Sequence, residues 1–156
     1  MSSYALLCRV LHTVRTPVFE CSIVAEGRVR MSPEEGLWWC NGVEPGAITE
    51  SGEGPKVAFQ AFSQTFRNTL SDLAEECGNF EEFQRQGRML FVTDTSEEKR
   101  WMTALDEQRR YEIEDEFKGL PEWKVRPSTI SFTLTAEAKA PLAQLNETTV
   151  AMAKAA

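Results

Sequence analysis

The sequence predicts one α+β domain, in which an antiparallel sheet of three to five strands packs on a long amphipathic helix. Apolar and polar residues alternate over 19–27, which is typical of a half-buried strand. Pro and Gly separate the next apolar runs, and large apolar residues then recur every three or four positions over 59–77. At 156 residues, the chain can bury a core without a metal or a disulfide.

Composition and net charge indicate which classes of partner the chain can bind. The chain is 42% hydrophobic and 26% charged, which is typical of a soluble globular protein. Its 24 acidic and 17 basic residues give a formal net charge of −7. Because nucleic-acid binding relies on a basic surface, nucleic acid is not expected as the main partner. The acidic balance fits solubility alone, or steering toward a basic protein.

The cysteines and the single histidine do not form a recognisable metal motif. Cys8, Cys21, Cys40 and Cys77 are widely spaced without a C-x-x-C pair, and His12 is the one histidine. We therefore expect no metal site and no cofactor. The sequence shows neither a signal-peptide pattern nor an apolar run long enough to span a membrane. It predicts a cytoplasmic protein with reduced, buried cysteines.

The N-terminal half predicts a meander of strands. Residues 4–14 fit either a helical stripe or strand alternation, so that segment stays open. Residues 19–27 predict a strand that ends at Gly27, and the Pro and Gly of 31–36 predict a turn. Two further strands are expected at about 37–43 and 47–51, joined by a Pro-Gly turn.

The strongest periodic signal is a helix that begins at Pro55, a residue suited to the first helical position. Its apolar stripe, which is expected to face the sheet, is Phe59, Phe62, Phe66, Leu70, Leu73 and Cys77. Its polar residues, which are expected on the other face, are Gln60, Gln64, Arg67, Asn68 and Ser71.

The segment 79–87 predicts a short helix that Asn79 could cap and that ends at Gly87, followed by a strand over 88–94. Thr95 and Glu98 have the spacing of a capping box, so they predict the start of another helix. That helix should bury one side, which carries Trp101, Met102 and Leu105. Beyond it, 106–119 is heavily charged and predicts a solvated face.

We divide the chain into an α+β domain at 1–118 and a C-terminal part at 119–156. The second part begins with a proline-bounded linker, continues as a strand, and ends in an alanine-rich tail in which Pro141 interrupts any single helix. The strand's alternating residues are Ile130, Phe132 and Leu134. An exposed edge at 129–134 is a candidate for oligomerisation.

The sequence contains no recognisable catalytic motif. His12 could in principle activate Cys21 or Cys40, but both cysteines lie in strand patterns, where cysteine usually behaves as a small apolar residue. The paired glutamates lie in turns or at helix ends, where acids favour solubility and the helix dipole. We therefore do not expect an enzyme.

Trp38 and Trp39 are adjacent, so on one strand they must point to opposite faces. One is expected to pack under the long helix and the other to be a half-exposed anchor for a partner. The second face of the sheet could be covered by the N-terminal segment, the Trp101 helix, a second copy or a partner. The candidate partner contacts are Trp38, Trp39, Glu34, Glu35, Glu44 and Glu50.

Short motifs over residues 19–76 add a resemblance. They are Gly36, Pro45, Gly46, Thr49 and Gly52, followed by Ala58 and Ala61 in the helix. This pattern resembles the HicB-like antitoxin family. The resemblance implies a partial ribonuclease-H-like sheet without catalytic acids, and a protein that covers a small, basic, RNA-cleaving toxin. Family members often bind operator DNA through a C-terminal module, and 128–145 looks like the strand and first helix of a ribbon-helix-helix.

These observations favour a non-catalytic protein-binding module, and the resemblance implies that it neutralises a small, basic, RNA-cleaving partner as an antitoxin does. The alternative is a homo-oligomeric scaffold or regulatory domain without a toxin.

Overall fold

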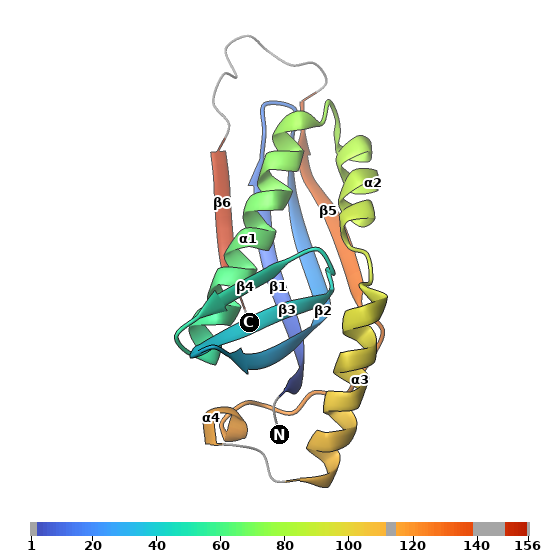
Figure 1. The fold of residues 1–156 in the computed structure, drawn as a ribbon. Helices are drawn as coiled ribbons and strands as arrows, with labels where there is room; N and C mark the ends of the chain where they lie inside the picture. Colours follow the sequence, from blue (N-terminus) through green and yellow to red (C-terminus); the bar gives the residue numbers. More distant parts are fainter. Residues whose placement is uncertain (1–2, 112–114, 139–148, 156) are drawn as a thin grey trace.

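The computed structural model describes residues 3–111, 115–138 and 149–155. It confirms the α+β class with an antiparallel sheet (Figure 1). The strands are β1 (Tyr4–Arg15), β2 (Phe19–Glu34), β3 (Leu37–Glu44), β4 (Thr49–Gly52), β5 (Thr129–Glu137) and β6 (Thr149–Ala155). The helices are α1 (Pro55–Glu76), α2 (Phe80–Leu90), α3 (Thr95–Arg110) and the short α4 (Asp115–Lys118).

The sheet has six strands, one more than the upper bound of the prediction. Their order is β4-β3-β2-β1-β6, and β5 also pairs with β2. The ambiguous first segment is strand β1, which pairs with β2 from Tyr4 to Arg15. Both β5 and β6 belong to this sheet, although they follow the linker in sequence.

Strand β2 divides one of its edges between two partners. Residues 19–26 pair with β5 and residues 28–34 pair with β3, while β1 occupies the opposite edge. The division falls at Gly27, where an added Cβ would overlap the backbone carbonyl of Glu44. The prediction that this strand ends at Gly27 is therefore wrong. The glycine instead allows β3 to approach while β2 continues to Glu34.

Helices cover both faces of the sheet. On one face, α1 and α2 lie over the main core, in which Phe62, Phe66 and Leu70 of α1 are buried (Figure 1). On the opposite face, α3 packs through Trp101 and Ala104 against a smaller cluster. Alternation along β1 separates the two layers, because Tyr4 and Cys8 join the first cluster whereas Ala5 joins the second.

Helix α2 extends to Leu90, into the region predicted to be a strand, and 91–94 form neither helix nor strand. Its cap is as predicted, since the Asn79 side chain accepts a hydrogen bond from the Glu82 amide at 2.8 Å. The helix continues to Leu90, and Gly87 lies inside it. An added Cβ at Gly87 would collide with the Phe132 ring. The glycine therefore serves the close approach of β5, and the predicted strand over 88–94 is wrong.

Helix α3 is capped one residue earlier than predicted. Asp94, not Thr95, caps it by accepting a hydrogen bond from the Glu97 amide at 3.0 Å. Trp101 is buried as expected, but Met102 is 49% exposed because Ala104 takes the inward position. The segment predicted to form the first helix of a ribbon-helix-helix, which includes Pro141, lies largely outside the described residues. Residues 149–155 form strand β6 against β1.

We predict that Gly27→Ala lowers the free energy of unfolding by at least about 2 kcal/mol, because the new Cβ must force β3 away from β2. Gly119→Ala is the control, since a Cβ there meets nothing within 4 Å. The control should change stability by less than about 1 kcal/mol. Urea unfolding of both variants checks this, and equal effects would contradict the close approach at Gly27.

Candidate functional site

The turn between β2 and β3 presents two exposed carboxylates. Glu34 pairs with Leu37, which leaves Glu35 and Gly36 as a two-residue turn with φ of 53° and 81°. Both values are typical of a hairpin turn of type I′, whose twist matches that of the strands. The turn therefore holds Glu34 and Glu35 in a defined position at the end of the sheet, exposed to solvent.

Trp38 and Trp39 are both half-buried, and strand alternation directs them to opposite faces. Trp38 packs on the α1 side, but its ring neighbours are Tyr4, at 6.4 Å between centroids, and Phe117, at 5.5 Å. Trp39 lies on the α3 side, opposite Ser32 of β2. Glu34 is two residues from Ser32 and shares this face, so it is a diagonal neighbour of Trp39.

The structure places the other two predicted glutamates differently. Glu44 is held inside the molecule by Arg28 at 3.3 Å and by the Thr93 hydroxyl at 2.9 Å, and its side chain is 17% exposed. Glu50 of β4 accepts a hydrogen bond from the Thr65 hydroxyl of α1 at 2.8 Å. Both carboxylates thus already bind groups of this chain.

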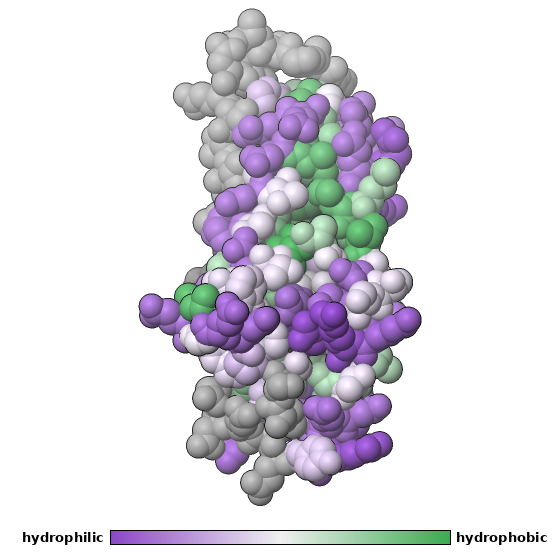
Figure 2. Space-filling view, viewed as in Figure 1, coloured by the Kyte–Doolittle hydropathy of each residue, from purple (hydrophilic) through white to green (hydrophobic). Residues whose placement is uncertain are grey.

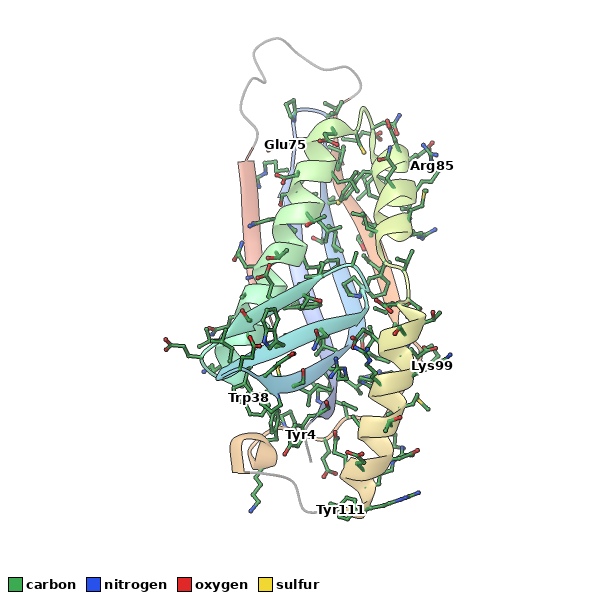
Figure 3. The ribbon with its side chains drawn as sticks, in the orientation of Figure 1. Tyr4, Trp38, Glu75, Arg85, Lys99 and Tyr111 are labelled. Atoms are coloured by element: carbon green, nitrogen blue, oxygen red, sulfur yellow. The ribbon has the colours of Figure 1, made fainter. Side chains whose placement is uncertain are left out.

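We define the acidic hairpin end as Glu34, Glu35, Trp39 and Glu53. Glu53 is exposed and directly follows Gly52, which pairs with Trp38. Glu53 could not be identified from the sequence, because only the β3–β4 pairing brings it beside the hairpin. Tyr111 and Glu75 lie away from this end, near opposite extremes of the molecule (Figure 3).

Arg28 links β2 to β3, to α3 and to the segment that precedes β5. Its Nη2 lies 2.7 Å from a carboxylate oxygen of Glu98 in α3 and 3.3 Å from that of Glu44 in β3. Its Nε donates a hydrogen bond to the Ser128 hydroxyl, next to β5, at 3.3 Å. The guanidinium carbon also lies 5.4 Å from the centre of the Trp101 ring, a cation–π distance.

Arg30 lies two residues further along β2 and also forms an ion pair with a glutamate of α3. Its guanidinium donates to both carboxylate oxygens of Glu97, at 2.7 and 3.2 Å. The two side chains are 11% and 13% exposed, so this bidentate pair is largely removed from water. Glu98, whose carboxylate was expected to complete the capping box of α3, likewise binds the sheet through Arg28, and Asp94 caps the helix.

His12 lies under α1 with Ser71. The His12 Nε2 and Ser71 Oγ atoms are 2.7 Å apart, and His12 Nδ1 has no hydrogen-bond partner among the described residues. Ser71 and Arg67 were expected to face solvent, but they are 7% and 9% exposed. That prediction is wrong because this side of α1 faces β1. A hydroxyl–imidazole pair can act as nucleophile and base, yet burial keeps a substrate from Ser71 Oγ.

Burial shifts the pKa values of titratable groups in the core. It lowers the pKa of His12 to about 4, and the positive charge of Arg67 adds to the effect. Burial also raises the pKa of Cys8 and of Cys21 to about 12, and it raises the pKa of Cys40. The four cysteines are buried and unbonded, as predicted, and these thiols stay protonated at neutral pH.

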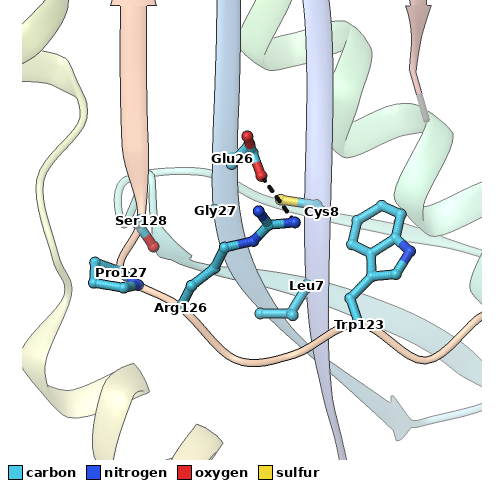
Figure 4. Close-up of a pocket in the computed structure, with 8 residues that line it drawn as sticks. All are labelled: Leu7, Cys8, Glu26, Gly27, Trp123, Arg126, Pro127 and Ser128. Carbon is cyan, nitrogen blue, oxygen red and sulfur yellow. Dashed lines mark ion pairs between the residues drawn. The ribbon is translucent and has the colours of Figure 1, made fainter.

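A hollow lies on the α3 side of the sheet, between β1, β2 and the linker (Figure 4). Trp123 and Leu7 line it, and Arg126 pairs with Glu26 across it at 3.6 Å. Its volume is about 10 Å³, room for roughly one water. Ligand sites measure hundreds of Å³, so this hollow is too small for an organic substrate.

The predicted oligomerisation residues face the core side of β5. Phe132 is 9% exposed and its ring lies 5.4 Å from that of Phe83 in α2. Ile130 is partly buried against the same core, and Leu134 is 38% exposed. Figure 2 shows a further apolar area over α1 and α2. Met89 and Val92, at the end of α2, are 66% and 49% exposed.

No family model matches the chain, and no curated protein or solved structure is significantly similar to it. Within the described residues, no helix is long and apolar enough to cross a membrane. The same part of the chain holds no group of three or more His, Cys, Asp or Glu residues placed to bind a metal ion.

We predict that Arg28→Met lowers the free energy of unfolding by about 2–4 kcal/mol, because it leaves the largely buried Glu44 carboxylate without its cation and removes the ion pair with the more exposed Glu98. Arg100→Met is the matched control. Arg100, like Arg28, forms an ion pair with a glutamate, in this case Glu97, but its side chain is 63% exposed. This control should cost less than about 1 kcal/mol. Urea unfolding measures both, and a loss no larger at Arg28 would contradict the role assigned to it.

We also predict that stability falls as the pH is lowered from 7 toward 4. The unfolded chain binds a proton at His12 near the ordinary pKa of about 6.5, whereas the folded chain binds it only near 4. Between these values the loss should approach about 1.4 kcal/mol per pH unit. Urea unfolding at several pH values should show a shallower dependence in His12→Gln. An unchanged slope in the variant would contradict this.

Proposed function

We propose that this protein is a non-catalytic protein-binding module that docks a small basic protein on its acidic hairpin end. The observation that carries the proposal is the shared face of Trp39 and Glu34 beyond the region that α3 covers. An aromatic ring beside exposed carboxylates suits lysine and arginine side chains, through ion pairs and cation–π contacts.

The charge of the whole chain favours the same class of partner. With a net charge of −7, the protein attracts a basic protein over distances limited by salt screening. The two-residue turn at Glu35 and Gly36 fixes the backbone that presents these charges, which favours a low backbone ordering cost on binding. Binding by this route should be fast and should weaken as salt rises.

A finer proposal is that the partner is an RNA-cleaving toxin and that the protein neutralises it. The resemblance of residues 19–76 to HicB-like antitoxins supports this, together with the order of strands followed by the long helix α1. A toxin that binds RNA must carry a basic surface, which matches the acidic hairpin end.

The test is affinity capture from the native cell extract with two variants matched in charge. In the first, Glu34→Gln and Glu35→Gln are combined. In the second, Glu75→Gln and Glu76→Gln neutralise two exposed acids at the far end of α1 (Figure 3). We expect the wild type to retain a small basic protein at about 50 mM salt and to lose it at about 300 mM.

The hairpin variant should lose this protein at low salt, and the α1 variant should retain it. Trp39→Ala should weaken retention as well, since aromatic anchors carry much of the energy of an interface. Equal retention by the hairpin variant and the wild type, or the absence of any basic protein, would contradict the proposal.

A further inference from the structure

One edge of β5 has no strand beside it. The strand pairs with β2 over Phe19–Glu26, and no other described strand pairs with it. Its 9 residues therefore leave a row of backbone N–H and C=O groups directed away from the sheet. Such an edge can accept another strand.

The side chains of β5 leave this edge unprotected. Thr129, Ser131 and Thr133 are exposed on the face opposite the buried Phe132. No charged residue, proline or glycine occurs from Thr129 to Ala136. Natural edge strands usually carry lysine, proline or another feature that blocks pairing. Residues of high β-propensity without charge instead favour strand addition.

The edge at β4 differs from that at β5. Strand β4 has 4 residues, and its Gly52 lies so close to α1 that an added Cβ would be 2.7 Å from the Ala58 nitrogen. Strand β5, in contrast, has 9 residues and no charged residue in its first 8 positions.

We propose that β5 pairs antiparallel with β5 of a second copy of this chain, so that two sheets join into one. A two-fold axis midway between the two strands brings the central residue of one strand opposite its own copy. A charge at that central position would meet a like charge, which destabilises a cross-strand pair. Because Thr129–Ala136 carries no charge, self-pairing meets no such repulsion along this stretch.

The hydroxyl and apolar side chains suit the same arrangement. Thr and Ser on the outer face can pair with their copies through hydrogen bonds. On the other face, Leu134 is 38% exposed and would lie beside the partner strand, where it loses contact with water.

The expected dependence on salt distinguishes this self-association from the binding of a basic partner. Two copies each carry a net charge of −7 and repel one another. Added salt screens that repulsion, so self-association should strengthen while binding at the acidic hairpin end weakens. Either proposal can therefore fail without the other.

The test uses two charged variants and their mixture. Thr133→Lys and Thr133→Glu change an exposed side chain at the centre of the row and leave the core face intact. We expect the wild type to double in mass with concentration in sedimentation equilibrium at about 150 mM salt. Each variant alone should remain a monomer, and an equal mixture should again form a dimer because Lys then faces Glu.

Gln60→Lys is the control, because Gln60 is exposed on α1 and should leave the dimer unchanged. Circular dichroism and the melting temperature of each variant establish that the fold is retained. A monomeric wild type at every concentration and salt would overturn the proposal. So would a dimeric Thr133→Lys variant, or a mixture that fails to associate.

Discussion

The fold depends most on the contacts that Arg28 makes at the point where β2 changes partners. Gly27 lets the end of β3 approach, and Arg28 then binds Glu44 of β3, Ser128 before β5, and Glu98 of α3. One largely buried guanidinium thus satisfies acceptors from three elements that are distant in sequence. An arginine suits this position because its planar group offers five donors in fixed directions, which a lysine cannot reproduce.

Much of the local structure could be predicted from the sequence. The alternation after Phe19, the long apolar stripe of α1 and the cap at Asn79 each report a short-range preference, and each element is present. The errors at Gly27 and Gly87 have one physical cause. Glycine was interpreted as the end of an element, whereas the structure uses both positions for the close approach of another chain segment. Such approaches depend on tertiary contacts, which one sequence does not display.

The candidate site was predictable only in part for the same reason. Glu34 and Glu35 could be assigned to an exposed turn, because turn chemistry is local. Glu44 could not be distinguished from them, since its partner Arg28 is 16 residues away and becomes its neighbour only when β2 and β3 pair. Likewise, Arg67 and Ser71 have the spacing of a polar helix face, and only the position of β1 shows that they are buried. Two surface sites remain, the acidic hairpin end and the edge of β5 that faces away from β2, and we expect them to respond oppositely to salt.

Amide hydrogen exchange along β5 at low and high protein concentration tests the central claim, that this surface edge is where the protein assembles. We expect the amides of Thr129–Glu137 that point away from β2 to exchange rapidly in dilute solution. The same amides should become protected as concentration and salt rise, while those of the β2–β3 turn do not change. Exchange from β5 that is independent of concentration would contradict the account.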